Sequence, residues 1–137
     1  MLAAGARRAM RLPVSGAFHS PLMAGVAADL AAAFERETWH DARIPVISNV
    51  TAEPITDAAE IRRQLAEQVR SPVEWVRCVE RMVADGIEVM VECGAGAALT
   101  GMVRRIAPEV RTGAVNDGAT LAAAVALVSA VPAEASA

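Results

Sequence analysis

Short apolar segments alternate with helical patterns along this chain, and this alternation restricts the possible folds more than any other feature. Three segments are predicted strands because they are short, rich in apolar residues and bounded by turn-forming residues: 44–50, 87–93 and 111–115. Residues 8–15 are a fourth strand candidate. Because helical patterns separate these strands, the sequence predicts an α/β fold with a mainly parallel sheet.

The intervening helices are indicated by their first residues and by their apolar spacing. Ser20 is a favoured N-cap and Pro21 suits the first helical position, so we expect a helix from there to about Glu37. Asp57 with Glu60 three positions later is typical of a capping box and predicts a second helix. Further helices are expected from Ser71–Pro72 to Gly86, over 97–106, and from Asn116–Asp117 to about Ser129. The residues expected to face the core are Leu22, Val26, Leu30, Phe34, Ala58, Ile61, Leu65, Val69, Val76, Val79 and Val83.

The composition excludes several classes of protein. With 137 residues, of which 54% are hydrophobic and 21% charged, the chain can form a packed core and does not resemble a disordered segment. A net charge of −3 is not typical of a nucleic-acid binder. The longest uncharged stretch, 12–28, is interrupted by prolines and glycines, and the N-terminus lacks the apolar core of a signal peptide. We therefore expect a cytoplasmic protein with no nucleic-acid or membrane partner.

Nucleophiles and metal ligands are scarce in this sequence. Cys78 and Cys93 have no histidine nearby and match no zinc-site spacing, so we expect two reduced thiols, no metal and no cofactor. Cys93 ends a predicted strand before a tight turn, which suits a nucleophile, but its neighbours indicate packing in the core. No serine lies in a Gly-x-Ser-x-Gly elbow, so the chain has no recognisable nucleophile.

His19 lies in a glycine-containing loop directly before the first predicted helix. The partial positive charge at a helix N-terminus disfavours imidazolium and keeps the ring in the neutral form that a general base requires. His19 is therefore a candidate general base, although most loop histidines are simply polar surface. The other histidine, His40, is expected to cap the C-terminal end of the same helix.

The turn at 94–98 joins a predicted strand to a predicted helix and contains two glycines. Such glycines let a phosphate approach a helix N-terminus, and Asp117 follows at a distance typical of a dinucleotide-binding unit. The third position of that fingerprint is Leu99 instead of glycine or alanine. The turn is better interpreted as packing a helix against a strand, and a nucleotide-binding domain is kept as an alternative.

Five sequence blocks occur together in the order and spacing of one enzyme family: LPVSGAFHSPLM (12–23), PVISNV (45–50), QVRSPVEW (68–75), ECGAGAALTGMVRRI (92–106) and AVNDG (114–118). Over roughly residues 10–127 the chain resembles malonyl-CoA:acyl-carrier-protein transacylases and the related acyltransferase domains of polyketide synthases. The resemblance implies the C-terminal part of an α/β-hydrolase-like acyltransferase core. It assigns 1–15 to the last strand of a small ferredoxin-like subdomain and a connector, 16–128 to the core, and 129–137 to a frayed tail.

The resemblance also implies a mechanism. In this family an elbow serine attacks the malonyl thioester of coenzyme A, a histidine takes the serine proton, and malonyl passes to the phosphopantetheine thiol of the acyl carrier protein. His19 matches that catalytic histidine, and Gln68 matches a residue whose backbone carbonyl orients it. Phe18 matches a position that tends to be Phe for malonyl and Ser for methylmalonyl in the polyketide domains. Asn49 matches a frequent asparagine near the site, and is equally well interpreted as a turn residue ending a strand.

The family's elbow serine, carboxylate-binding arginine and oxyanion glutamine lie upstream of the histidine block, and only 18 residues precede His19. We therefore interpret the chain as a C-terminal fragment of a malonyl transacylase of fatty acid biosynthesis, inactive alone. Its expected partners are malonyl-CoA, the acyl carrier protein and the missing N-terminal half. A non-catalytic carrier-protein-binding module and a fragment of a polyketide synthase acyltransferase are alternatives.

Overall fold

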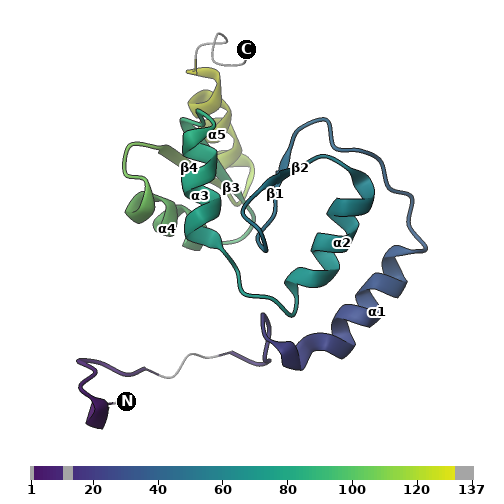
Figure 1. The fold of residues 1–137 in the computed structure, drawn as a ribbon. Coiled ribbons are helices and arrows are strands. Elements are labelled where there is room, and N and C mark those ends of the chain that lie inside the picture. The colour runs from purple at the N-terminus through teal and green to yellow at the C-terminus, as the bar shows by residue number, and fades with distance from the viewer. Residues whose placement is uncertain (1, 11–13, 132–137) are drawn as a thin grey trace.

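A computed structural model describes residues 2–10 and 14–131 (Figure 1). The helices are α1 (Ala24–Phe34), α2 (Ala58–Gln68), α3 (Trp75–Ala84), α4 (Ala98–Ile106) and α5 (Gly118–Ser129). The strands are β1 (Val46–Ile47), β2 (Pro54–Ile55), β3 (Val89–Cys93) and β4 (Arg111–Val115). Short 3₁₀ turns span Leu2–Ala4 and Pro21–Met23. The predicted α/β class is confirmed, and each of the five helices corresponds to a predicted one.

The strands form two separate pairs. β3 and β4 are parallel, with Val89 opposite Arg111, and α4 forms the crossover between them. β1 and β2 form an antiparallel hairpin. The predicted strand 44–50 is reduced to two residues because Ser48 begins the hairpin loop, where its Oγ accepts the backbone N–H groups of Val50 and Thr51. The partner strand β2 was not predicted, since two residues carry no periodicity.

The hydrophobic core lies between α3, α4 and the parallel pair. Its fully buried centre is Val79, packed with Val103 of α4 and with Val110, which precedes β4. The inward stripe of α3 consists of Trp75, Cys78, Val79 and Met82, which are spaced i, i+3, i+4 and i+7. Val76, expected to face inward, is 52% exposed because it lies outside that stripe.

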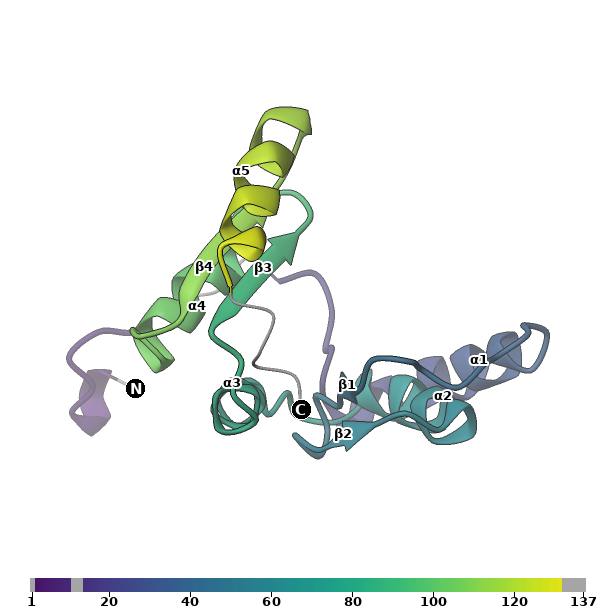
Figure 2. The same ribbon diagram turned by 90° about the horizontal axis from the view of Figure 1, so that it is seen from above.

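Helices α1 and α2 pack side by side through small residues (Figures 1 and 2). The buried residue of α1 is Ala27, whereas Leu22 and Val26, expected to face the core, are 83% and 46% exposed. The apolar spacing indicated a helix correctly, and Leu30 and Phe34 of the expected stripe are half-buried, but the prediction is wrong for Leu22 and Val26. The α1 face that looks toward α2 consists of alanines: Ala27 is buried there, and Ala24, Ala28 and Ala31 line a hollow between the two helices.

Ser20 occupies the predicted N-cap position, before Pro21, but without a capping hydrogen bond, and the expected helix start at Ser71 and cap at His40 are wrong. The Ser20 hydroxyl donates to the Ala17 carbonyl at 2.7 Å, and the residue makes no side-chain cap. The Ser71 hydroxyl donates back to α2, and α3 begins only at Trp75. The indole N–H of Trp39 donates to the Phe34 carbonyl at 3.0 Å, so it occupies the helix end that His40 was expected to cap. His40 lies exposed beyond α1.

The N-terminal strand candidate is not observed in the described residues. Residues 8–10 and 14–15 have no strand structure, and residues 11–13 lie outside the described part. Residues 2–10 lie apart from the helices and sheets in Figure 1. Most of the expected frayed tail, 132–137, also lies outside the described residues. The division into a subdomain strand, a core and a tail stays a prediction.

Candidate functional site

His19 lies on the loop before α1 and is held by the C-terminal end of α2. Its backbone N–H donates to the Val69 carbonyl at 2.8 Å, and its ring Nδ1 lies 2.9 Å from the backbone oxygen of Gln68. Because a carbonyl oxygen can only accept, this contact assigns the imidazole hydrogen to Nδ1. The lone pair is then on Nε2 of an exposed side chain, where it can receive a proton from a reacting group.

The backbone of His19 is unusual as well. Its φ is +62°, in the left-handed region that non-glycine residues adopt uncommonly. The two contacts with α2 hold the residue there. The acceptors in these contacts are the carbonyls of Gln68, the last residue of α2, and Val69, its C-cap. Carbonyls at the end of a helix have no hydrogen-bond partner within the helix. The end of α2 therefore determines where the imidazole points.

That end of α2 is braced by one carboxylate. Glu67 accepts hydrogen bonds from Arg70, from Nε at 2.9 Å and from a terminal nitrogen at 2.7 Å. Its other oxygen accepts the Ser71 hydroxyl at 2.8 Å. The hydrogen bonds from Arg70 first, and from Ser71 second, lower the pKa of Glu67. These contacts span Gln68 and Val69, the two residues whose carbonyls hold His19.

Phe18 directly precedes His19 and folds back over Gly16. A Cβ at Gly16 would lie 2.8 Å from the Phe18 ring, so the glycine leaves room for this arrangement. The Phe18 side chain is 58% exposed. It therefore shares an exposed loop with His19 and is accessible to a ligand that approaches the imidazole.

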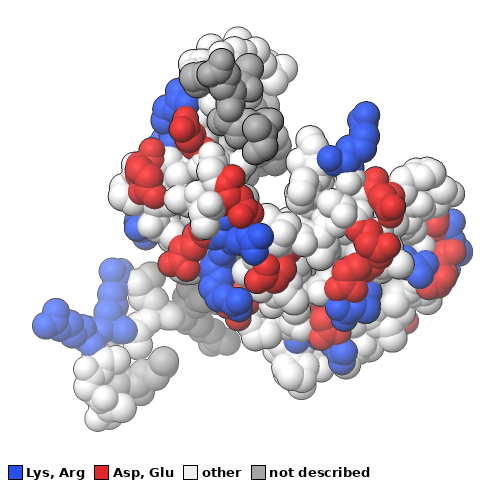
Figure 3. All heavy atoms as spheres, turned by 45° about the horizontal axis from the view of Figure 1, so that its top comes forward, with Lys and Arg blue, Asp and Glu red and all other residues white. Residues whose placement is uncertain are grey.

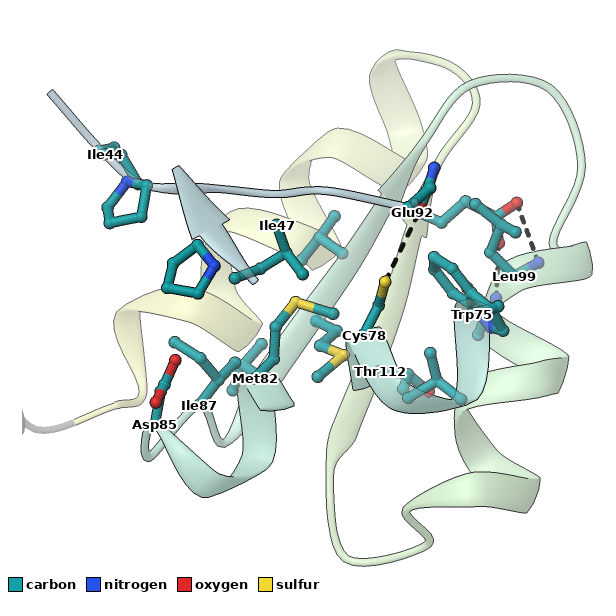
Figure 4. Close-up of a pocket in the computed structure, with 18 residues that line it drawn as sticks. Ile44, Ile47, Trp75, Cys78, Met82, Asp85, Ile87, Glu92, Leu99 and Thr112 are labelled. Atoms are coloured by element: carbon teal, nitrogen blue, oxygen red, sulfur yellow. Dashed lines mark hydrogen bonds between the residues drawn. The ribbon is translucent and has the colours of Figure 1, made fainter. Parts of the chain in front are cut away.

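Asn49 lies in the β1–β2 loop. Its backbone carbonyl accepts the Glu74 N–H at 2.8 Å, and its Oδ1 is 3.7 Å from the Cys78 sulfur. It lines an apolar groove of about 690 Å³ between the hairpin, α3, α4 and the parallel strands (Figure 4). Other residues lining this groove include Ile47, Trp75, Met90 and Leu99. The structure thus brings Gln68 to His19 and places Asn49 in the groove.

Several backbone N–H groups at the turn between β3 and α4 donate to side chains of the chain itself. Glu92 accepts the backbone N–H of Thr100 at 2.8 Å and that of Leu99 at 3.3 Å, and Asn116 accepts the N–H of Gly96 at 2.7 Å. The hydrogen bond from the Thr100 N–H is the largest cause that lowers the pKa of Glu92. A carboxylate at this helix N-terminus would repel a phosphate, which counts against the nucleotide-binding alternative. Sequence reasoning missed Glu92, although an acidic residue just before a glycine turn and a helix was a signal.

The two cysteines differ in their surroundings. Cys78 is 1% exposed, and its burial raises the pKa of its thiol. Cys93, expected to pack in the core, is exposed at the end of β3. Among the residues that the structure describes, no three His, Cys, Asp or Glu side chains gather to hold a metal ion. Within the same residues, no helix is long and apolar enough to cross a membrane.

The face seen in Figure 3 carries acidic and basic side chains intermixed. Several acidic and basic side chains of the described residues are paired, as Glu60 is with Arg63 at 2.6 Å and Asp85 with Arg81 at 2.9 Å. Pairing along a helix contributes little stability at an exposed site. Because acidic side chains lie among the basic ones over the main body in Figure 3, this face has no continuous positive surface of the kind that nucleic-acid binding requires.

Comparison with known proteins identifies the class of enzyme that this fold resembles. No protein-family model matches the chain. An acyl carrier protein S-malonyltransferase from Vibrio cholerae superposes with a TM-score of 0.81 at 43% identity, over 89% of this chain and 40% of that structure. A malonyl-transacylase solved in complex with a type II polyketide synthase acyl-carrier protein superposes with a TM-score of 0.83 at 36% identity, over 92% and 41%. The fold is therefore similar to that of acyltransferases that act with carrier proteins.

Curated malonyl CoA-acyl carrier protein transacylases are also similar to the chain in sequence. The malonyl CoA-acyl carrier protein transacylase of Salmonella typhimurium is 42% identical over 123 residues, which are 90% of this chain and 40% of that protein. The resemblance to the C-terminal part of the malonyl-CoA:acyl-carrier-protein transacylase family is confirmed. The chain spans about two fifths of the length of these relatives.

Proposed function

We propose that this chain is the histidine-bearing part of a malonyl-CoA:acyl-carrier-protein transacylase of fatty acid biosynthesis and is inactive alone. The observation that carries the proposal is the contact between His19 Nδ1 and the Gln68 carbonyl. In the neutral imidazole this contact puts the lone pair on Nε2 of an exposed side chain, as a general base requires. The nucleophilic serine is supplied by a segment that corresponds to the N-terminal three fifths of the relatives.

The reaction then has two halves. In the first, Nε2 of His19 takes the proton of the serine hydroxyl while the serine oxygen attacks the malonyl thioester carbonyl. The carbon–sulfur bond breaks, and the imidazolium returns the proton to the coenzyme A thiolate. In the second half the phosphopantetheine thiol gives its proton to His19 and attacks the malonyl-serine ester. The serine oxygen leaves and recovers its proton from the imidazolium.

The Gln68 carbonyl assists both halves. It stabilises the imidazolium that forms at each step without adding a full negative charge, which is a variation on the third member of a catalytic triad. Phe18, on the same exposed loop, is positioned to contact the acyl group. Asn49 supports the site from the groove side, where it joins the β1–β2 loop to α3.

The apolar groove supports the need for a second segment. Large apolar side chains are exposed around it, including Ile44 at 81% and Ile87 at 44%. A contiguous apolar surface of this kind is typical of an interface that another polypeptide covers. We therefore place the contact with the serine-bearing segment over this groove.

A chimera tests the proposal. Residues 14–131 replace the matching C-terminal part of the Salmonella typhimurium relative, and transfer of malonyl from coenzyme A to the carrier protein is measured. We expect no turnover by the 137-residue chain and turnover by the chimera. His19→Ala lowers kcat of the chimera by at least about 10²-fold, whereas His40→Ala, the matched control, leaves it unchanged.

Three results would overturn the proposal. Turnover by the isolated chain contradicts its expected inactivity, an unchanged rate in His19→Ala contradicts the role of the histidine, and a folded chimera without activity contradicts the family assignment of this part. Binding of the carrier protein by the isolated chain, together with an inactive chimera, identifies the non-catalytic binding module instead.

A further inference from the structure

We propose that Glu67 is a positioning residue that sets the tautomer of His19. It acts through the last turn of α2, because its carboxylate links that turn to the two residues that follow Val69. The catalytic meaning of this inference rests on the proposed function. The geometry that it describes does not, so the two can fail separately.

The argument begins with the position of the carbonyls. The oxygens of Gln68 and Val69 are 2.9 Å from His19 Nδ1 and 2.8 Å from its backbone nitrogen. Both residues lie at the end of a helix, where the last carbonyls have no partners within the helix and the backbone frays readily. The two carbonyls can stay directed at His19 only if a further interaction keeps the last turn of α2 ordered.

Glu67 provides the restraint. One of its oxygens binds the guanidinium of Arg70 through two nitrogens, and the other binds the Ser71 hydroxyl. The backbone carbonyl of Glu67 also accepts the N–H groups of Val69 and Arg70. The side chain and the backbone carbonyl of Glu67 are therefore both hydrogen-bonded to residues on the far side of Gln68, which restrains Gln68 and Val69 between them. Charge-assisted hydrogen bonds of this type are stronger than neutral ones.

The consequence falls on the imidazole. While the Gln68 carbonyl stays in place, the hydrogen is held on Nδ1 and the lone pair is on Nε2. If the turn loosens, Nδ1 loses its acceptor, and the ring returns to the form with hydrogen on Nε2 that free imidazole side chains favour. That form has no lone pair at the exposed nitrogen. Glu67 thus controls which nitrogen of His19 can accept a proton, without touching the ring.

The tautomer can be measured directly in the 137-residue chain. It has only two histidines, so a long-range ¹⁵N–¹H correlation spectrum resolves both rings, with His40 as the internal reference. At about pH 8, above the ordinary histidine pKa, we expect the Nδ1–H pattern for His19. Glu67→Ala shifts His19 to a majority of the Nε2–H pattern. The matched control is Glu60→Ala, which removes the same kind of Glu–Arg pair, three positions apart, from the same helix.

A second variant keeps the proposal falsifiable if Glu67→Ala disturbs the fold, which the backbone amide spectrum reports. Ser71→Ala removes one of the Glu67 hydrogen bonds and shifts the tautomer in the same direction by less. An unchanged Nδ1–H pattern in folded Glu67→Ala or, if that variant does not fold, in Ser71→Ala overturns the inference. An equal shift in Glu60→Ala also overturns it, because general loosening of α2 is then sufficient.

Discussion

Substituting Ser48 by alanine tests how the β1–β2 hairpin is fastened to α2. The Ser48 hydroxyl donates to Gln64 Oε1 at 2.9 Å and accepts the N–H groups of Val50 at 3.1 Å and Thr51 at 3.3 Å. Ser48 is 5% exposed and Gln64 6% exposed. Water therefore cannot readily replace the lost hydroxyl.

The expected cost follows from these contacts. An unsatisfied buried acceptor at Gln64 costs about 1–3 kcal/mol, and each of the two longer contacts contributes about 0.5 kcal/mol at most. We expect Ser48→Ala to lower the free energy of unfolding by about 2 kcal/mol. Adding Gln64→Leu also removes the acceptor that Ser48→Ala leaves unsatisfied. The free energy of unfolding of the double variant therefore falls by about 1 kcal/mol less than the sum of the two single losses.

Urea denaturation of the four proteins, followed by circular dichroism, gives these free energies. Ser15→Ala, at an exposed serine, is the control for the substitution itself. The reasoning is wrong if Ser48→Ala costs under about 0.5 kcal/mol, the range of an ordinary surface change. It is also wrong if the two single effects add without coupling, because the hydrogen bond then contributes nothing specific.

Two further predictions concern the cysteines and the carboxylates. A thiol reagent modifies exposed Cys93 rapidly and reaches Cys78 only on unfolding, because Cys78 is buried and the pKa of its thiol is raised. Equal rates of thiol modification in Cys93→Ser and Cys78→Ser would contradict this. The hydrogen bonds from Arg63 first, and Gln64 second, lower the pKa of Glu60 from 4.5 to about 2, so its contribution to stability is complete above about pH 4.5 and is lost as the pH falls toward 2. The urea midpoint of Glu60→Gln therefore depends less on pH between 4.5 and 2 than that of the unaltered chain, and parallel pH profiles would refute the assignment.

Much of the local structure was predictable because its signals lie within one or two turns of the chain. The segment β3–α4–β4 was expected from an apolar run, two glycines and a second short strand, and the structure has these elements in this order. Gly94 and Gly96 have φ values of +140° and +102°, as a tight turn before a helix requires. Asp117 and Thr120 form the cap expected at the start of α5.

The errors share a different origin. Leu22 and Val26 have the spacing of a buried stripe, yet the alanines of α1 face α2. Periodicity identifies a helix, whereas the face that is buried depends on the shape of its neighbour. The end of α1 was also misplaced, because Trp39 packs against Phe34 and takes its carbonyl. Such contacts become visible only once the chain has folded back on itself.

For the candidate site, too, some features were predictable from the sequence and others depended on the tertiary structure. The sequence by itself determined that a histidine precedes a helix, and the resemblance of its flanking block made it a candidate base with Gln68 as its partner. Only the tertiary structure brought His19 to the Gln68 carbonyl, 49 positions further along the chain. The contacts of Glu67 with Arg70 and Ser71 are local, but they bear on the imidazole only because His19 lies against that end of α2. The physical reason is that a tautomer depends on which atom the ring meets in space. That atom is set by the packing of α1 against α2.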